Sequence, residues 1–134
     1  MLAGQAQKEA FVNEAHALTD ALLHCAIEGV ASAPPPAPAN GANWLVGEAA
    51  SGAWAGHEGR IACRQAGNWL FVPPRDGMRV LDRTTGQERR FSGIWRAPTS
   101  PVEPSGGSTV DAEARGAILE LIAALREAGI FAET

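Results

Sequence analysis

Apolar residues near the N-terminus recur with the period of an α-helix. The main stripe follows an i, i+4, i+7 spacing through Phe11, Ala15, Leu18, Leu22 and Cys25, and Val12, Leu23 and Ala26 widen it. The pattern predicts an amphipathic helix from about Gln5 to Glu28, within an N-terminal helical segment of residues 1–30. Gly29 fits the C-terminal cap of that helix, because glycine readily adopts the left-handed conformation found there.

A proline-rich stretch follows this helical pattern. Pro34, Pro35, Pro36 and Pro38 crowd the segment from Ala31 to Ala39, and proline cannot continue a helix. We therefore expect residues 31–42 to form an extended linker in the polyproline II conformation.

Short alternating apolar runs, separated by turn residues, predict a small antiparallel β module over residues 43–98. The expected strands are Trp44–Val46, Gly59–Arg64, Trp69–Val72, Met78–Asp82 and a last one from about Glu88 to Trp95. The clearest hairpin turns at Gln65–Asn68, because Gly67 and Asn68 both tolerate positive φ. Trp69 and Phe71 alternate on what should be the core-facing side of this module of four to six strands.

A second breaker region, residues 99–108, predicts another linker, and residues 109–134 read as a C-terminal helix. Ser108 or Thr109 could cap this helix, and Gly129 fits its end. Its apolar face comprises Ile118, Leu121, Ile122 and Leu125. A helix of this length is marginal alone in water, so the face should pack either on the β module or on a second copy in a homo-oligomer. Together these patterns predict an α+β fold.

Composition narrows the range of partners. The 134 residues carry a formal net charge of −4, which provides no overall basic field for nucleic acid. No apolar run reaches the roughly 18 residues that a membrane span needs, so we expect no membrane insertion. The N-terminus lacks the pattern of a signal peptide, which indicates a protein made in the cytoplasm. Cys25 and Cys63 do not have metal-ligand spacing, and whether they pair or remain buried thiols is open.

The sequence offers no convincing catalytic group, metal site or cofactor site. His16 and Asp20 lie one helical turn apart, but no activated nucleophile accompanies them, and a helix-surface hydrogen bond is the simpler interpretation. The carboxylates of Asp76, Asp82 and Glu88 have no visible reason to face each other across a cleft. We therefore expect a protein that is not an enzyme.

Three residues are candidates for ligand binding: Trp54, His57 and Trp95. Trp54 and Trp95 stand at expected strand ends, where an exposed indole can stack on a sugar ring or simply close the end of a sheet. His57 lies in a glycine-rich turn, where its imidazole could bind a hydroxyl or tie the loop to its own backbone. These residues point to a carbohydrate-binding module as one possible function.

Several segments, taken in order, resemble a domain family of unknown function found in prophages and gene transfer agents. The matching segments are AGQAQKEAFVNEA at residues 3–15, the proline-bearing residues 33–39, SGAWAGH at 51–57, the Gly-x-Trp at 67–69 and the Pro-Arg-x-Gly turn at 74–77. The chain departs from the family pattern at Glu9, where histidine is usual, and residues after Pro98 lie outside the shared domain. The resemblance implies no catalytic residues.

The resemblance implies a virion structural protein, a component of a tail fibre or head spike that reaches the host surface. It also raises the importance of the polar cluster Gln5, Gln7, Lys8, Asn13 and Glu14, which either docks on a neighbouring subunit or forms a solvated helix face. From the sequence we expect a structural subunit of a phage-like particle that contributes to host attachment. The alternative is a module that recognises cell-envelope or capsular polysaccharide.

Overall fold

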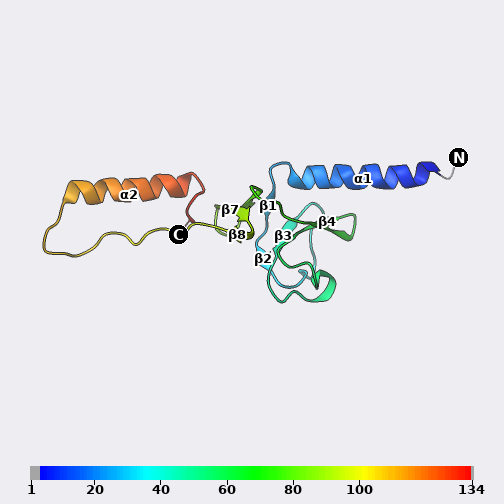
Figure 1. The fold of residues 1–134 in the computed structure, drawn as a ribbon, viewed down its shortest axis with the longest axis horizontal. Helices are drawn as coiled ribbons and strands as arrows, with labels where there is room; N and C mark the ends of the chain where they lie inside the picture. The colour runs from blue at the N-terminus through cyan, green and yellow to red at the C-terminus, as the bar shows by residue number, and fades with distance from the viewer. Residues whose placement is uncertain (1–3, 134) are drawn as a thin grey trace.

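The computed structural model describes residues 4–133, with side chains described from residue 7 onward, and it shows the expected α+β fold. The elements in chain order are α1 (Gly4–Leu22), β1 (Ala26–Ile27), β2 (Val30–Ala31), β3 (Asn43–Val46), the 3-10 turn η1 (Gly52–Trp54), β4 (Ile61–Gln65), β5 (Asn68–Val72), β6 (Arg79–Asp82), β7 (Gln87–Ser92), β8 (Ile94–Arg96) and α2 (Ala112–Glu127). Figure 1 shows the two helices extending from opposite ends of a small β module.

The strands form two four-stranded sheets. The first has the order β1-β6-β7-β8 and the second the order β2-β3-β4-β5. Most neighbours are antiparallel, but β1 pairs with β6 and β2 pairs with β3 in parallel. The six-residue stretch that contains β1 and β2 thus contributes an edge strand to each sheet.

The main core lies where the two sheets meet the end of α1. Its buried residues come from every layer: Ala21, Ile27, Leu45, Ile61, Cys63, Val72 and Val80. Leu18 and Leu22 of α1 pack against this cluster, so the predicted apolar stripe of the helix is used, but only at its C-terminal end. Phe11 and Val12, in the N-terminal half of the same helix, remain 71% and 51% exposed.

The N-terminal helix ends earlier than predicted. It stops at Leu22 instead of Glu28, and His24 takes a left-handed conformation with φ of 58°. The buried Asn43 side chain then donates hydrogen bonds to the carbonyl oxygens of Ala21 and Ala26, at 3.5 and 3.3 Å. These bonds satisfy carbonyls at the end of the helix and turn the chain into β1. Gly29 is therefore not a helix cap but joins β1 to β2.

The last predicted strand is in fact a hairpin. Gly93, with φ of 70°, separates β7 from β8, and Phe91 pairs with Trp95 across the turn. The Asp76 carboxylate accepts a hydrogen bond from the Gly93 amide at 2.9 Å, which fixes the turn. The predicted turn residue Asp76 thus supports a second turn as well.

The C-terminal helix starts later than predicted and is attached at both ends. Asp111, not Ser108 or Thr109, caps α2 by accepting a hydrogen bond from the Ala114 amide. The connection before α2 runs beside it: Arg115 donates to the Gly106 carbonyl, and Arg126 lies 3.9 Å from Glu103. Residues 99–108 therefore run beside α2 and touch it through Gly106 and Glu103, although most of them are exposed (Figure 1).

After α2 the chain returns to the turn between β6 and β7. Gly129 ends the helix with φ of 69°, as predicted, and its carbonyl accepts a hydrogen bond from the Glu88 amide. The buried Gln87 side chain donates to the carbonyls of both Pro98 and Ile130, which lie at the two ends of the excursion. One amide group thus holds both ends of the α2 segment on the first sheet.

The predicted hairpin between β4 and β5 is confirmed, but the residues with positive φ are Ala66 and Gly67, not Gly67 and Asn68. Residues 65 and 68 pair directly, so Ala66 and Gly67 form a two-residue turn with φ of 47° and 80°. Positive φ at both positions matches a type I′ turn, in which asparagine is strongly preferred to alanine at the first position. Ala66 therefore stores backbone strain.

This strain makes Ala66→Asn a stabilising substitution. Relief of the left-handed alanine should raise the free energy of unfolding by about 0.5–1 kcal/mol, and chemical denaturation should show a higher midpoint with an unchanged slope. Ala37→Asn, on the exposed proline-rich segment, is a matched control that should leave the midpoint unchanged. A midpoint for Ala66→Asn at or below that of the unsubstituted protein would contradict the assignment of strain to this turn.

Candidate functional site

The second sheet has an aromatic cluster on the face away from the main core. The rings of Trp44, Trp54 and Trp69 contact each other pairwise, with centroids 5.1 to 6.3 Å apart. Val46 and Ala62 lie beneath them, and the guanidinium of Arg64 lies 5.1 Å from the Trp69 ring centroid. Trp69 and Phe71 thus pack in a core, as predicted, but on the opposite face of the sheet from Ile61 and Cys63.

Trp54 is fully buried at the centre of this cluster, so its indole has no face to offer a ligand. The predicted ligand-binding role therefore does not fit its position. Its turn, η1, folds the indole back onto the sheet, and the indole N–H has no hydrogen-bond partner among the described residues. Trp54 is a core residue that closes this face of the second sheet.

His57 also packs against the sheet. Its ring stacks on Phe71 with centroids 3.7 Å apart and planes within 2° of parallel. Its backbone amide donates to the Trp54 carbonyl, so both side chain and backbone hold the loop. The predicted bond from the imidazole to the loop backbone is not found among the described residues, where the buried Nδ1 has no hydrogen-bond partner. Stacking on Phe71 is the contact that positions the His57 side chain.

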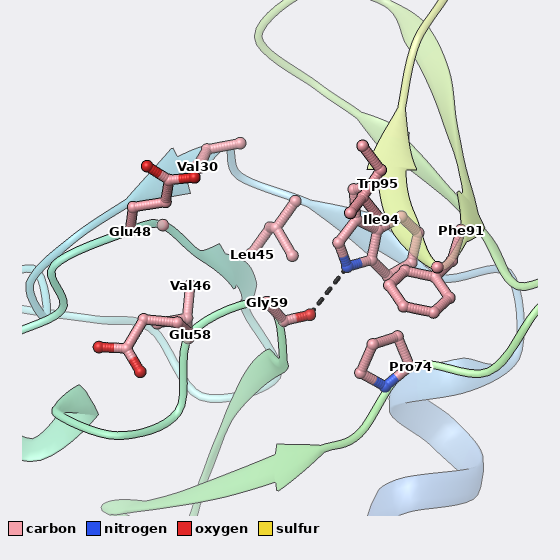
Figure 2. A pocket seen from close by; sticks show the side chains of 12 residues that line it. Val30, Leu45, Val46, Glu48, Glu58, Gly59, Pro74, Phe91, Ile94 and Trp95 are labelled. Carbon is pink, nitrogen blue, oxygen red and sulfur yellow. Dashed lines mark hydrogen bonds between the residues drawn. The ribbon is translucent and has the colours of Figure 1, made fainter.

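Trp95 does line a groove, which lies between the two sheets (Figure 2). Its indole N–H donates to the Gly59 carbonyl at 2.8 Å, and this bond ties β8 to the loop just before β4 of the second sheet. The Trp95 ring meets the Phe91 ring edge-to-face, with centroids 5.3 Å apart. Because its N–H is already bonded, Trp95 can offer a ligand only its apolar surface.

The groove has a volume of about 550 Å³ and is mostly apolar. Ile94, Phe91 and Trp95 stand on one side, Leu45 forms part of the floor, and Val30 with Glu48 and Glu58 lies on the other side (Figure 2). A hydrogen bond from its own backbone amide, together with one from Ala50, holds the pKa of Glu58 below the usual range despite partial desolvation. The groove can therefore offer a sugar-sized ligand an apolar wall and an ionised rim.

The sequence indicated only Trp95 among these groove residues. Phe91 and Ile94 could not be assigned to the groove, because the hairpin at Gly93 decides which side chains meet Trp95. Pro74 comes from a segment that the sequence placed in a turn, and Val30 lies at the end of the segment, residues 1–30, that the sequence placed in the N-terminal helix. The alternation of Phe91, Gly93 and Trp95 was the available signal.

The polar docking residues lie on the projecting part of α1. Gln7, Lys8, Asn13 and Glu14 are exposed, whereas Gln5 lies outside the residues whose side chains are described. Asn13 and Glu14 also line a hollow of about 380 Å³ between α1 and the β4–β5 turn. The structure thus leaves this face of the helix accessible.

The apolar residues of α2 do not form one accessible face. Ile118 and Leu121 are 44% and 60% exposed, but Ile122 is buried and Leu125 is half-buried. Ile122 lies on the side of the helix that also carries Arg115 and Arg126, which contact the connection before α2. The prediction that all four residues form an oligomerisation face is therefore corrected, because the chain itself covers Ile122.

Cys25, Cys63 and Asp82 are titratable residues with structural positions. Cys25 and Cys63 are free thiols, and burial raises the pKa of Cys63 to about 12 and that of Cys25 above its ordinary value. Burial alone would raise the pKa of Asp82, but hydrogen bonds from Thr84 and Arg89 outweigh it and hold this pKa low. Asp82 thus organises the β6–β7 turn, and it is not available to act with Glu88 or Asp76.

A family model described as "Protein of unknown function (DUF2793)" matches residues 12–96, which is more than half of the chain. The chain belongs to this family. The matched region contains both sheets and the rear half of α1, and it ends where β8 ends. No curated protein matches the sequence. Among the described residues, no helix is both long and apolar enough to cross a membrane.

The burial of Trp54 leads to a stability prediction. Trp54→Ala should lower the free energy of unfolding by about 3–5 kcal/mol, because it empties the centre of the aromatic cluster. Trp54→Phe should cost clearly less, since it keeps most of the apolar contact and the lost indole N–H has no partner to leave unpaired. Equal losses for the two variants in thermal denaturation would indicate that the N–H makes a bond that the described contacts do not include.

Proposed function

We propose that the protein is a non-enzymatic structural subunit of a phage-like particle, either a prophage or a gene transfer agent. It would form part of a tail fibre or head spike and contribute to attachment at the host surface. The resemblance of its motifs to proteins of such particles supports this role, and family membership alone does not specify it.

The projecting half of α1 is the structural observation that carries the proposal. This half extends beyond the β module (Figure 1), and it carries the exposed apolar residues Phe11 and Val12 beside the polar residues Lys8, Asn13 and Glu14. An exposed apolar strip rimmed by polar side chains is typical of a protein–protein contact. In the proposed role, α1 docks on a neighbouring particle protein and the β module faces outward.

Particle composition tests this proposal. The protein should be present in purified particles from a strain that produces them, and the double variant Phe11→Ser/Val12→Ser should be lost from particles while still folding. Leu23→Ser is a matched control, because Leu23 is 68% exposed at the other end of the helix segment. Particles that contain no copy of the protein would contradict the proposal.

The groove beside Trp95 favours a second candidate function, recognition of envelope polysaccharide. Its wall of Phe91, Ile94 and Trp95 provides the apolar surface on which a sugar ring can stack, and Glu48 and Glu58 lie across from it. This function is compatible with a particle subunit, since attachment to a cell requires recognition of its surface.

Glycan binding should therefore depend on the groove wall. Ile94→Ser should weaken binding to envelope polysaccharide at least about fivefold, because it removes a 60% exposed apolar group without disturbing the core. Leu81→Ser, a similarly exposed aliphatic on β6 outside the groove, is the control. The measurement is a glycan array followed by titration, and equal binding by both variants would exclude the groove as the site.

A further inference from the structure

The outer face of the first sheet carries a row of three arginines. Arg79 on β6 pairs in register with Arg90 on β7, which in turn pairs with Arg96 on β8. Residues paired directly across antiparallel strands point to the same face, and all three are exposed. Strands lie about 4.8 Å apart, so the row spans roughly 10 Å.

Most of the positive charge in this row has no carboxylate partner among the described residues. Like charges directly opposite each other destabilise a sheet, yet only Arg79 has a carboxylate partner, Glu88, at 3.0 Å. In the described part of the chain, Arg90 and Arg96 form no ion pair. Two shallow hollows of about 250 and 370 Å³ lie along the row, and both are lined by Arg90, Arg96 and Pro98. The face therefore has the positive charge and the shallow hollows that an acidic partner could occupy.

The outward face of α2 has the matching pattern. Glu113, Glu120 and Glu127 recur every seven residues, which places them along one side of the helix about 10.5 Å apart. All three are exposed, and Ala117 and Ala124 lie between them, so another surface can approach closely. This side is opposite the buried Ile122. Two neighbouring glutamates are therefore about as far apart as the two ends of the arginine row, and the three glutamates together span about 21 Å.

We propose that the acidic face of α2 in one copy docks on the arginine row of a second copy. This inference rests on the proposed role as an assembling subunit, and it names the surfaces of self-association. The chain's own α2 extends away from the β module (Figure 1), and its glutamate side is exposed and accessible to a second copy. The two surfaces differ, and the contact is therefore head-to-tail and repeats along a chain or closes in a ring.

Aliphatic side chains favour a helix over a simple polyanion as the occupant. Leu81 and Ile94 are 41% and 60% exposed on the same sheet face as the arginines, and Ile94 also borders the groove because it lies on the edge strand β8. Leu119 and Leu121 flank the acidic side of α2. A contact that combines apolar groups with opposite charges is typical of a protein interface. A polyanion would pair with the arginines but leave these aliphatic groups exposed.

Charge reversal tests the contact in the full-length protein. Arg90→Glu and Glu120→Arg should each raise the dissociation constant for self-association at least about tenfold in sedimentation velocity, and higher salt should weaken the unsubstituted association. The chain that carries both substitutions should associate again. An equimolar mixture of the two single variants should also associate again, with the variants in alternation. The reversed row of one variant complements the reversed helix of the other, and their two unsubstituted faces complement each other.

Arg75→Glu and Asp20→Arg are controls that change net charge equally at exposed positions outside both surfaces, and they should leave association unchanged. A monomeric unsubstituted protein at all concentrations, or a double variant as dissociated as the singles, would overturn the inference. So would retention of a monomeric protein by polygalacturonate through Arg90, which would identify a polyanion site. If the protein is present in particles but does not self-associate, the proposed function stands and the docking inference fails. If it self-associates but is absent from particles, the docking inference stands and the proposed function fails.

Discussion

The whole β module depends on backbone pairing by one short stretch, Ala26 to Ala31. Its first two residues pair with β6 of one sheet and its last two pair with β3 of the other. Ile27, at the centre of this stretch, is completely buried in the main core. Among the described residues, the other links between the two sheets are side-chain contacts, the bond from Trp95 to Gly59 and the chain that connects β5 to β6. The position of the groove, which lies between the sheets, follows from this double pairing.

The sequence predicted the larger elements because each repeats its pattern several times. The β4–β5 hairpin and the glycine stop of α2 appear where expected, and α1 forms over most of its predicted range but ends six residues early, at Leu22. The strands β1 and β2 were missed because two residues contain no alternation to recognise. The early end of α1 was missed because it depends on Asn43, a residue far along the chain that bonds to Ala21 and Ala26.

The candidate surfaces were harder to predict than the fold. Trp54 and Trp95 both stand near turns, and only the path of the backbone decides that Trp54 is buried while Trp95 borders a groove. The net charge of −4 likewise conceals the arginine row, because Arg79, Arg90 and Arg96 become neighbours only through strand register. Burial and register are long-range properties, and neither is encoded in local spacing.

The amide of Gln87 has a mechanical consequence. It donates hydrogen bonds to the carbonyls of both Pro98 and Ile130. The segment that contains α2 therefore leaves the β module and returns to it at the same place. A pull on α2 would load both attachments at the same time and would pass into β7, a central strand of its sheet. Because both ends of the α2 segment are held at Gln87, they share an applied force, and one end cannot be pulled off the sheet before the other.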